Sequence, residues 1–262
     1  MSRFEDSVLV SSDFDGTIGY TNEPAPNGMT VELAYHQAVC EVLGHEACNT
    51  YSQTGGLINR APAEVVAALL PDTDEETQRV QTEALIQTKL GYLLDQIGCR
   101  LDDGTRWPRL TPGFPETWED IQRLRGKDVP VHTAVISSGH TAFINTFFDT
   151  HGLKRPDFMV TDDDMRGSRY AVPLRVKPSP LLVTKVQEQW WEYYGINGVG
   201  EADLHVLTER TVYAGDDPTK DGQLARNSGI EFIHINPANS VPGWEKVGQW
   251  VARHVGVASA AV

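Results

Sequence analysis

The most constraining feature of the sequence is a run near its start, Val8-Leu9-Val10-Ser11-Ser12-Asp13-Phe14-Asp15-Gly16-Thr17. A short apolar run that ends in acidic residues predicts a buried strand that delivers carboxylates to the edge of a sheet. Asp13 and Asp15 share one face if the strand continues, and Gly16 predicts a turn. Two carboxylates this close repel each other unless a cation lies between them or one is protonated. The run therefore predicts either a cation site or an Asp-Gly turn after a core strand.

The rest of the chain predicts an α/β fold with an inserted helical segment. Apolar runs predict strands at 8–12, 129–137, 158–160, 210–214 and 231–236, with helices between them, which indicates a Rossmann-like, doubly wound, mostly parallel sheet covered on both faces. Residues 29–98 instead show helical periodicity with breaks at Gly44, Gly55-Gly56 and Pro71. We therefore expect a core domain at 1–19 and 105–262, and a helical domain at 20–104.

Charge and cysteine content narrow the class of protein. The net charge of −14 argues against nucleic-acid binding, which requires a basic surface. The sequence contains no apolar stretch near the ~20 residues that span a bilayer, and its first residues lack the pattern of a signal peptide. Cys40, Cys48 and Cys99 form no metal-binding spacing, and their odd number predicts reduced thiols. We expect a cytoplasmic protein without membrane or nucleic-acid partners.

Three more predicted elements carry polar residues where they begin or end. Ser137-Ser138 follows the strand at 129–137, Lys177 precedes a helix, and Asp216-Asp217 follows the strand at 210–214. Each alone is typical of a turn or a helix cap. Together, at one edge of a parallel sheet, they supply oxygen ligands for Mg²⁺, hydroxyl and N–H donors for a phosphate, and a cation.

These four motifs resemble those of the haloacid dehalogenase-like (HAD) hydrolase superfamily, in its C1-capped phosphatase, β-phosphoglucomutase-like and phosphonatase-like branch. Asp13-Phe14-Asp15-Gly16-Thr17 matches the first motif, Asp-x-Asp-Gly-Thr. Ser137 matches the second motif, Lys177 the third, and Gly215-Asp216-Asp217-Pro218-Thr219-Lys220-Asp221 the fourth. The helical segment at 20–104 is placed like the C1 cap, a lid over the active site.

The resemblance implies a role for each motif residue. Asp13 is implied to be the nucleophile and Asp15 the general acid and base, while Ser137, Ser138 and Thr17 bind phosphate. The implied Mg²⁺ ligands are Asp13, Asp15, Asp216 and Asp217, and the sequence leaves open which of the last two dominates. Lys177 is the implied catalytic lysine, with Lys185 as its alternative because the preceding stretch at 162–176 is long and acidic.

The implied activity is Mg²⁺-dependent hydrolysis of a small phosphorylated metabolite through an aspartyl-phosphate. Arg60 resembles the cap arginine that contacts a substrate phosphate in β-phosphoglucomutase-like members, although a surface arginine would look the same. The alternatives are a phosphomutase with the same residues, and a catalytically idle protein that binds a phosphorylated ligand or a partner. We expect a monomer or a homodimer.

Overall fold

The computed structural model describes residues 4–55, 61–125, 127, 129–166, 170, 172–196 and 207–256. The chain forms two compact units: Met1–Tyr20 with Arg109–Val262, and Thr21–Pro108. These boundaries lie one residue and four residues from the predicted ones, at 19 and 105.

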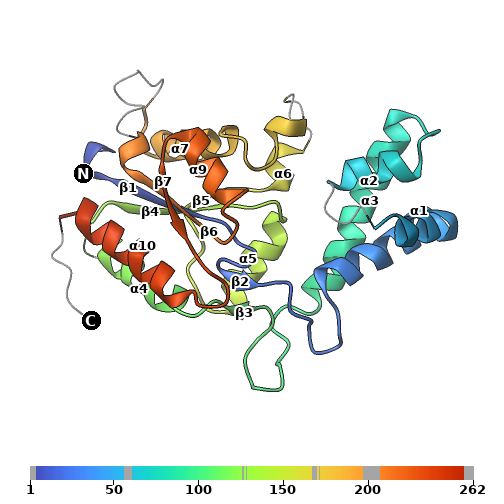
Figure 1. The fold of residues 1–262 in the computed structure, drawn as a ribbon, viewed down its shortest axis with the longest axis horizontal. Helices are drawn as coiled ribbons and strands as arrows, with labels where there is room; N and C mark the ends of the chain where they lie inside the picture. Colours follow the sequence, from blue (N-terminus) through green and yellow to red (C-terminus); the bar gives the residue numbers. More distant parts are fainter. Residues whose placement is uncertain are drawn as a thin grey trace. The chain divides into compact units, whose positions relative to one another are not determined.

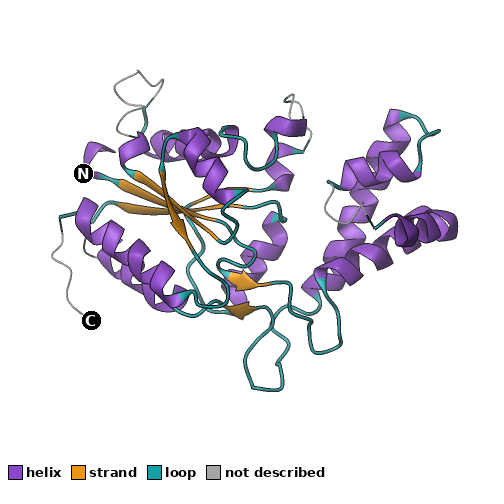
Figure 2. Cartoon of the chain, viewed as in Figure 1, coloured by secondary structure: helices purple, strands orange, loops and turns teal. Residues whose placement is uncertain are grey.

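The first unit is built on a five-stranded parallel sheet with the order β5-β4-β1-β6-β7. Its strands are β1 (Val8–Ser12), β4 (Val131–Ile136), β5 (Phe158–Val160), β6 (Thr211–Gly215) and β7 (Glu231–His234). All five residues of β1 are buried, because this central strand pairs with β4 on one side and with β6 on the other. Figure 2 shows the strands surrounded by helices. The predicted α/β class is confirmed.

Helices cover both faces of this sheet (Figure 1). One face carries α7 (Leu181–Tyr193) and α9 (Asp221–Ser228), and the other carries α4 (Phe114–Arg125) and α10 (Val241–His254). The sequence analysis did not anticipate α10, whose buried Trp244 packs 5.0 Å from the ring of Phe114. The remaining elements are η1 (Phe4–Asp6), α5 (Thr141–Thr150), α6 (Asp162–Met165), η2 (Val172–Leu174) and the antiparallel pair β2 (Gly19–Tyr20) and β3 (Arg109–Leu110).

The second unit is helical, with α1 (Val31–Thr54), α2 (Pro62–Leu69) and α3 (Glu75–Leu94). Its own core includes Tyr35, Val39 and Leu85, which are buried. The side chain of Thr30 caps α1 and that of Asp74 caps α3, each by accepting a hydrogen bond from a backbone N–H in the first turn. Among the described residues of the chain, no helix combines the length and the apolar character that crossing a membrane requires.

The expectation of three reduced thiols is wrong, because Cys40 and Cys48 form a disulfide. Eight residues of continuous helix would separate their Cα atoms by about 12 Å, whereas the two atoms lie 4.5 Å apart. The cause is Gly44, which interrupts α1 at φ 86° and ψ 175°, a backbone region open almost only to glycine. The interruption brings the segments on either side of Gly44 together. The cysteine count therefore no longer argues for a reducing compartment.

A buried histidine on β4 predicts a pH-dependent stability. His132 is 5% exposed, its Nε2 lies 2.9 Å from the hydroxyl of Tyr194, and burial lowers its pKa to about 4 despite the nearby Asp157. Between pH 6.5 and 4 the unfolded chain binds the extra proton, so this residue's contribution is complete above pH 6.5 and is lost as the pH falls. The difference between the ordinary pKa of 6.5 and the pKa of about 4 in the fold corresponds to about 3 kcal/mol of unfolding free energy.

Urea unfolding of the wild type and of His132→Gln measures the pH-dependent contribution of His132 to stability. Glutamine has no titratable proton and keeps a polar nitrogen for Tyr194. We expect the wild type to lose more stability than the variant between pH 6.5 and 4. Parallel stability curves for the two proteins would show that His132 titrates normally in the fold.

Candidate active site

The loops that follow three neighbouring strands place polar residues at one edge of the sheet. Asp13 follows β1, Ser137 follows β4, and Asp216 follows β6. The three strands are parallel and adjacent, so their carboxyl ends meet at one edge. The backbone N–H of Asp13 donates to the carbonyl of Ala214, which ties the end of β1 to the end of β6.

A buried lysine connects two of the acidic residues. The Nζ of Lys177 lies 2.5 Å from Oδ1 of Asp13 and 2.9 Å from Oδ1 of Asp221, and its side chain is only 6% exposed. It also lies 5.6 Å from the ring centroid of Tyr213. Lys185, the alternative from the sequence, lies on α7 and pairs with Glu188 there. Of the two lysines, Lys177 therefore contacts the predicted nucleophile.

Asp216 is held against the turn that follows β1. The Thr17 hydroxyl donates to Oδ1 of Asp216 over 3.4 Å, and Thr17 is fully buried. The resemblance assigns Thr17 to phosphate binding, and in this structure its hydroxyl contacts the Asp216 carboxylate. Gly16, at φ +71°, lets this turn approach so closely that a Cβ there would lie 2.5 Å from Oδ2 of Asp216.

The two adjacent acids of the fourth motif have different surroundings. One oxygen of Asp217 accepts hydrogen bonds from the backbone N–H groups of Thr219 and Lys220, at 2.8 and 3.0 Å. These bonds lower the pKa of Asp217, and the bond from Lys220 has the larger effect. The acidic cluster in which a metal could be held contains Asp13, Asp216 and Asp221, but neither Asp217 nor Asp15. Of the two adjacent acids, Asp217 thus has one oxygen, Oδ1, engaged in its own turn.

The second motif forms a compact turn beside the acids. The hydroxyl of buried Ser137 accepts the backbone N–H of Gly139 at 2.9 Å, which leaves its proton available to a ligand. Ser138 is exposed. The carboxylate of Asp15 lies close to this turn, since a Cβ on Gly139 would be 3.9 Å from Asp15 Oδ2. Sequence reasoning did not single out Gly139, where a Cβ would lie 3.1 Å from the Oγ of Ser137.

Buried negative charge dominates the electrostatics of the site. Burial raises the pKa of Asp13 to about 7, Lys177 opposes the rise, and Asp221 and Asp15 add to it. Burial and then Asp221 raise the pKa of Asp216. Burial alone would lower the pKa of Lys177, but the charge of Asp13 holds it well above its ordinary range. One ammonium thus faces several carboxylates, an excess of negative charge that a cation would relieve.

The donor set fits a hard divalent cation. Carboxylate oxygens of Asp13, Asp216 and Asp221 lie within 4.8 Å of one another. Both oxygens of Asp221 accept hydrogen bonds, Oδ1 from Lys177 and Oδ2 from the backbone N–H of Asp217 at 3.1 Å, so Asp221 positions those groups. Asp13 and Asp216 remain as donors, and Mg²⁺ typically takes one or two carboxylates and fills its other positions with water and phosphate oxygens.

Gly16→Ala is expected to damage this cation site. The added methyl group would displace the Asp216 carboxylate, and we expect Mg²⁺ affinity to fall by about 10- to 100-fold in isothermal titration. Gly28→Ala is the matched control: its φ of +83° imposes similar backbone strain, but nothing lies within 4 Å of the added carbon. Equal Mg²⁺ affinities in the two variants would show that the Gly16 contact does not position a ligand.

One predicted site residue cannot be placed, and two further residues contact Lys177. Arg60 lies outside the described residues. Asp221 and Tyr213 contact Lys177. The resemblance implies that Asp221 positions Lys177 or a metal-bound water, whereas sequence reasoning missed Tyr213. For Asp221 the signal was its place as the last acid of the fourth motif. For Tyr213 none existed, because an aromatic residue inside a strand is typical of any core.

Comparisons with known proteins identify the fold. No protein-family model matches the chain, and no curated protein matches it by sequence. CbbY from Rhodobacter sphaeroides, solved in complex with phosphate, is 16% identical with a TM-score of 0.52, over 88% of this chain and 86% of that one. A protein provisionally named beta-phosphoglucomutase from Thermotoga maritima is 15% identical with a TM-score of 0.50, over 92% and 99%. A HAD-superfamily hydrolase from Ehrlichia chaffeensis is 14% identical with a TM-score of 0.46, over 94% and 97%. The chain therefore shares its fold with CbbY and with the Thermotoga maritima protein.

Proposed function

We propose that the protein is a Mg²⁺-dependent phosphatase that hydrolyses small phosphorylated metabolites through a phosphoryl group carried on Asp13. The observation that carries the proposal is the buried contact of Asp13 with Lys177, beside the carboxylate of Asp216. A structural ion pair would need one carboxylate for one ammonium. Here Lys177 pairs with both Asp13 and Asp221, and Asp216 lies beside those two carboxylates. Such a charge excess suits a site that binds a cation and an anionic substrate.

In the first half of the reaction, an oxygen of Asp13 attacks the phosphorus atom. The bond between phosphorus and the substrate oxygen breaks, and Asp15 donates its proton to the departing oxygen. Lys177 holds the attacking carboxylate in place through the 2.5 Å contact. The hydroxyl of Ser137 and the N–H of Ser138 donate to the phosphoryl oxygens.

In the second half, water attacks the phosphorus of the aspartyl-phosphate. Asp15 accepts the water's proton, the bond from phosphorus to the Asp13 oxygen breaks, and inorganic phosphate leaves. Asp13 and Asp216 would hold the Mg²⁺, with Asp15 contributing its backbone carbonyl. When bound, the ion supplies positive charge that offsets the charge of the phosphoryl oxygens and the carboxylates.

Phosphate release from an aryl phosphate and a panel of sugar phosphates tests the proposal. We expect release with Mg²⁺, its loss with EDTA, and its recovery when Mg²⁺ is restored. Asp216→Asn and Asp217→Asn form a matched pair on adjacent positions. Asp216→Asn should lower activity by more than about 100-fold, while Asp217→Asn keeps an oxygen for the turn and most of its activity. Insensitivity to EDTA, or the reverse order of the two variants, would contradict the proposed metal site.

A phosphomutase would use the same residues. It differs in that the phosphoryl group on Asp13 survives long enough to be transferred to a second substrate, which depends on how well the closed site excludes water. One of the solved structures with this fold carries the provisional name beta-phosphoglucomutase. Isomerisation of a sugar phosphate without phosphate release would identify a mutase, and binding without turnover would identify an idle ligand-binding protein.

A further inference from the structure

Three metal-binding side chains converge in the helical unit, where the proposed function uses none of them. His36 and Cys40 lie one turn apart on α1, and Cys48 lies beyond the interruption at Gly44. Their ligand atoms lie within 4.8 Å of one another. All three residues are partly exposed, so an ion and a reductant can reach them.

The imidazole nitrogen lies near tetrahedral ligand distance from both sulfurs, which are bonded to each other and must separate to about 3.8 Å to bind one ion. His36 Nε2 lies 3.9 Å from the Sγ of Cys40 and 3.9 Å from the Sγ of Cys48. Zinc bonds of about 2.3 Å to sulfur and 2.0–2.1 Å to nitrogen, at the tetrahedral angle, place nitrogen and sulfur about 3.6 Å apart. The imidazole nitrogen thus lies at ligand distance from both sulfurs at once.

We propose that His36, Cys40 and Cys48 form a binding site for a thiophilic divalent cation such as Zn²⁺ once the disulfide is reduced. Two thiolates and one imidazole are ligands that zinc accepts, and they differ from the oxygen donors that select Mg²⁺. The site is therefore distinct from the acidic cluster at the sheet edge in both its ligands and its preferred metal.

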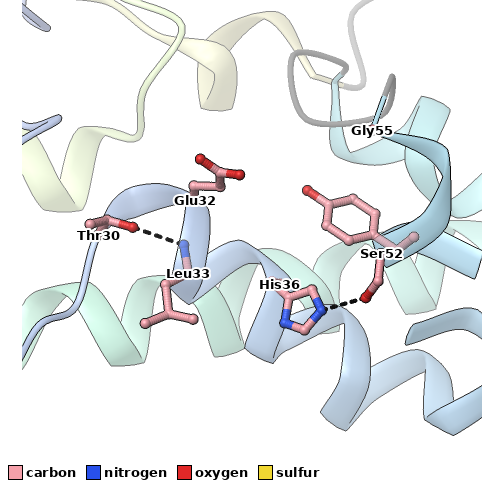
Figure 3. Close-up of a pocket in the computed structure, with 7 residues that line it drawn as sticks. Thr30, Glu32, Leu33, His36, Ser52 and Gly55 are labelled. Carbon is pink, nitrogen blue, oxygen red and sulfur yellow. Dashed lines mark hydrogen bonds between the residues drawn. The ribbon is translucent and has the colours of Figure 1, made fainter. Parts of the chain in front are cut away.

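The surroundings leave room for a fourth ligand. A cavity of about 390 Å³ is lined by Thr30, Glu32, Leu33, His36, Tyr51, Ser52 and Gly55. Figure 3 shows His36 and Ser52 facing each other on its wall, with Ser52 Oγ 2.8 Å from His36 Nε2. The Tyr51 hydroxyl is buried and has no hydrogen-bond partner among the described residues. Coordination of the ion by Nε2 would replace its contact with Ser52, and a water molecule in this cavity can supply the fourth ligand.

A two-electron reduction converts the disulfide form to the metal-binding form, and an added disulfide reagent such as oxidised glutathione reverses it by thiol–disulfide exchange. A phosphine reductant and one water molecule convert the disulfide to two thiols, with the phosphine oxidised to its oxide. The cation then binds both sulfurs and the imidazole nitrogen, and two protons leave the thiols. Affinity should consequently rise with pH and vanish when the disulfide forms again.

Cobalt titration of the full-length protein tests the proposal, because Co²⁺ bound to thiolates gives charge-transfer absorption that oxygen ligands do not. The protein is reduced with a phosphine, freed of reductant and titrated with Co²⁺ in excess Mg²⁺, which occupies the acidic site. We expect one Co²⁺ per chain with tetrahedral thiolate bands, displaced by Zn²⁺, and none for the oxidised protein. Failure here leaves the phosphatase proposal untouched, since no acidic-site residue takes part.

Matched variants assign the ligands. Cys40→Ser and Cys48→Ser should each lose the two-thiolate spectrum, and His36→Ala should bind more than about tenfold more weakly. Cys99→Ser and His45→Ala should match the wild type, since Cys99 lies outside the cluster and His45 is an exposed histidine on the same helix. Reduced wild type without thiolate bands, or an unchanged two-thiolate spectrum in either Cys40→Ser or Cys48→Ser, would overturn the proposal. Circular dichroism establishes that each variant is folded.

Discussion

Asp13→Asn is expected to reduce phosphate release by at least about 10⁴-fold, because an amide cannot replace the attacking carboxylate. The fold should not suffer. Asparagine has the same shape, and it removes a charge whose burial already raises the pKa of Asp13 to about 7. Lys177 would still pair with Asp221. We therefore expect the variant to be at least as stable as the wild type in urea unfolding near neutral pH.

Lost activity together with unchanged stability would distinguish a catalytic role of Asp13 from a structural one. A residue that only supports the fold lowers stability when it is replaced, and activity falls with it. Full activity in Asp13→Asn would show that the nucleophile is misassigned. A loss of several kcal/mol in stability would show that Asp13 serves mainly as the partner of Lys177.

Lys177→Gln is expected to affect both stability and activity. Its ammonium is 2.5 Å from Asp13 and 2.9 Å from Asp221, and removing it leaves buried carboxylates without a cation. Loss of one partner of a buried ion pair typically costs about 3–5 kcal/mol. Activity should fall by about 10²–10³-fold, because the nucleophile loses the group that positions it.

Lys185→Gln is the matched control for that experiment. Lys185 pairs with Glu188 on α7, and both side chains are about one-third exposed at 34%. Such a pair is worth less than about 1 kcal/mol, so we expect little change in stability or activity. Added Mg²⁺ should restore part of the stability of Lys177→Gln but none of its activity. Equal effects of the two substitutions would contradict the assignment of Lys177.

The sequence predicted the sheet and its motifs because those signals are local. The buried run at 8–12 and the acids that follow it lie within a single strand and turn. Distinguishing the surroundings of Asp216 from those of Asp217 required a contact between distant parts of the chain. The hydrogen bonds that Asp217 accepts come from Thr219 and Lys220 nearby, whereas the Thr17 hydroxyl that meets Asp216 is 199 residues away in the sequence.

The disulfide and the last helix were missed for different reasons. From the sequence, Gly44 is expected to end a helix. In the structure the chain changes direction at Gly44, and this change brings Cys48 close enough to Cys40 to form the disulfide. Helix α10 did carry a local signal, with buried Trp244, Val247, Trp250 and Val251 at helical spacing. The backbone conformation of a single glycine cannot be predicted from the residues around it. The apolar spacing of α10, by contrast, is visible in the sequence and predicts a helix.

The most direct test of the account is to locate the phosphoryl group on the protein during turnover. Asp15→Asn should slow the attack of water, while an aryl phosphate with a good leaving group still phosphorylates the enzyme without a general acid. Borohydride reduction of the quenched reaction converts an aspartyl-phosphate to homoserine, which peptide mass spectrometry can locate. The account predicts homoserine at position 13, dependent on Mg²⁺ and absent from the Asp13→Asn background. Homoserine at another position, or turnover without any modified residue, would contradict it.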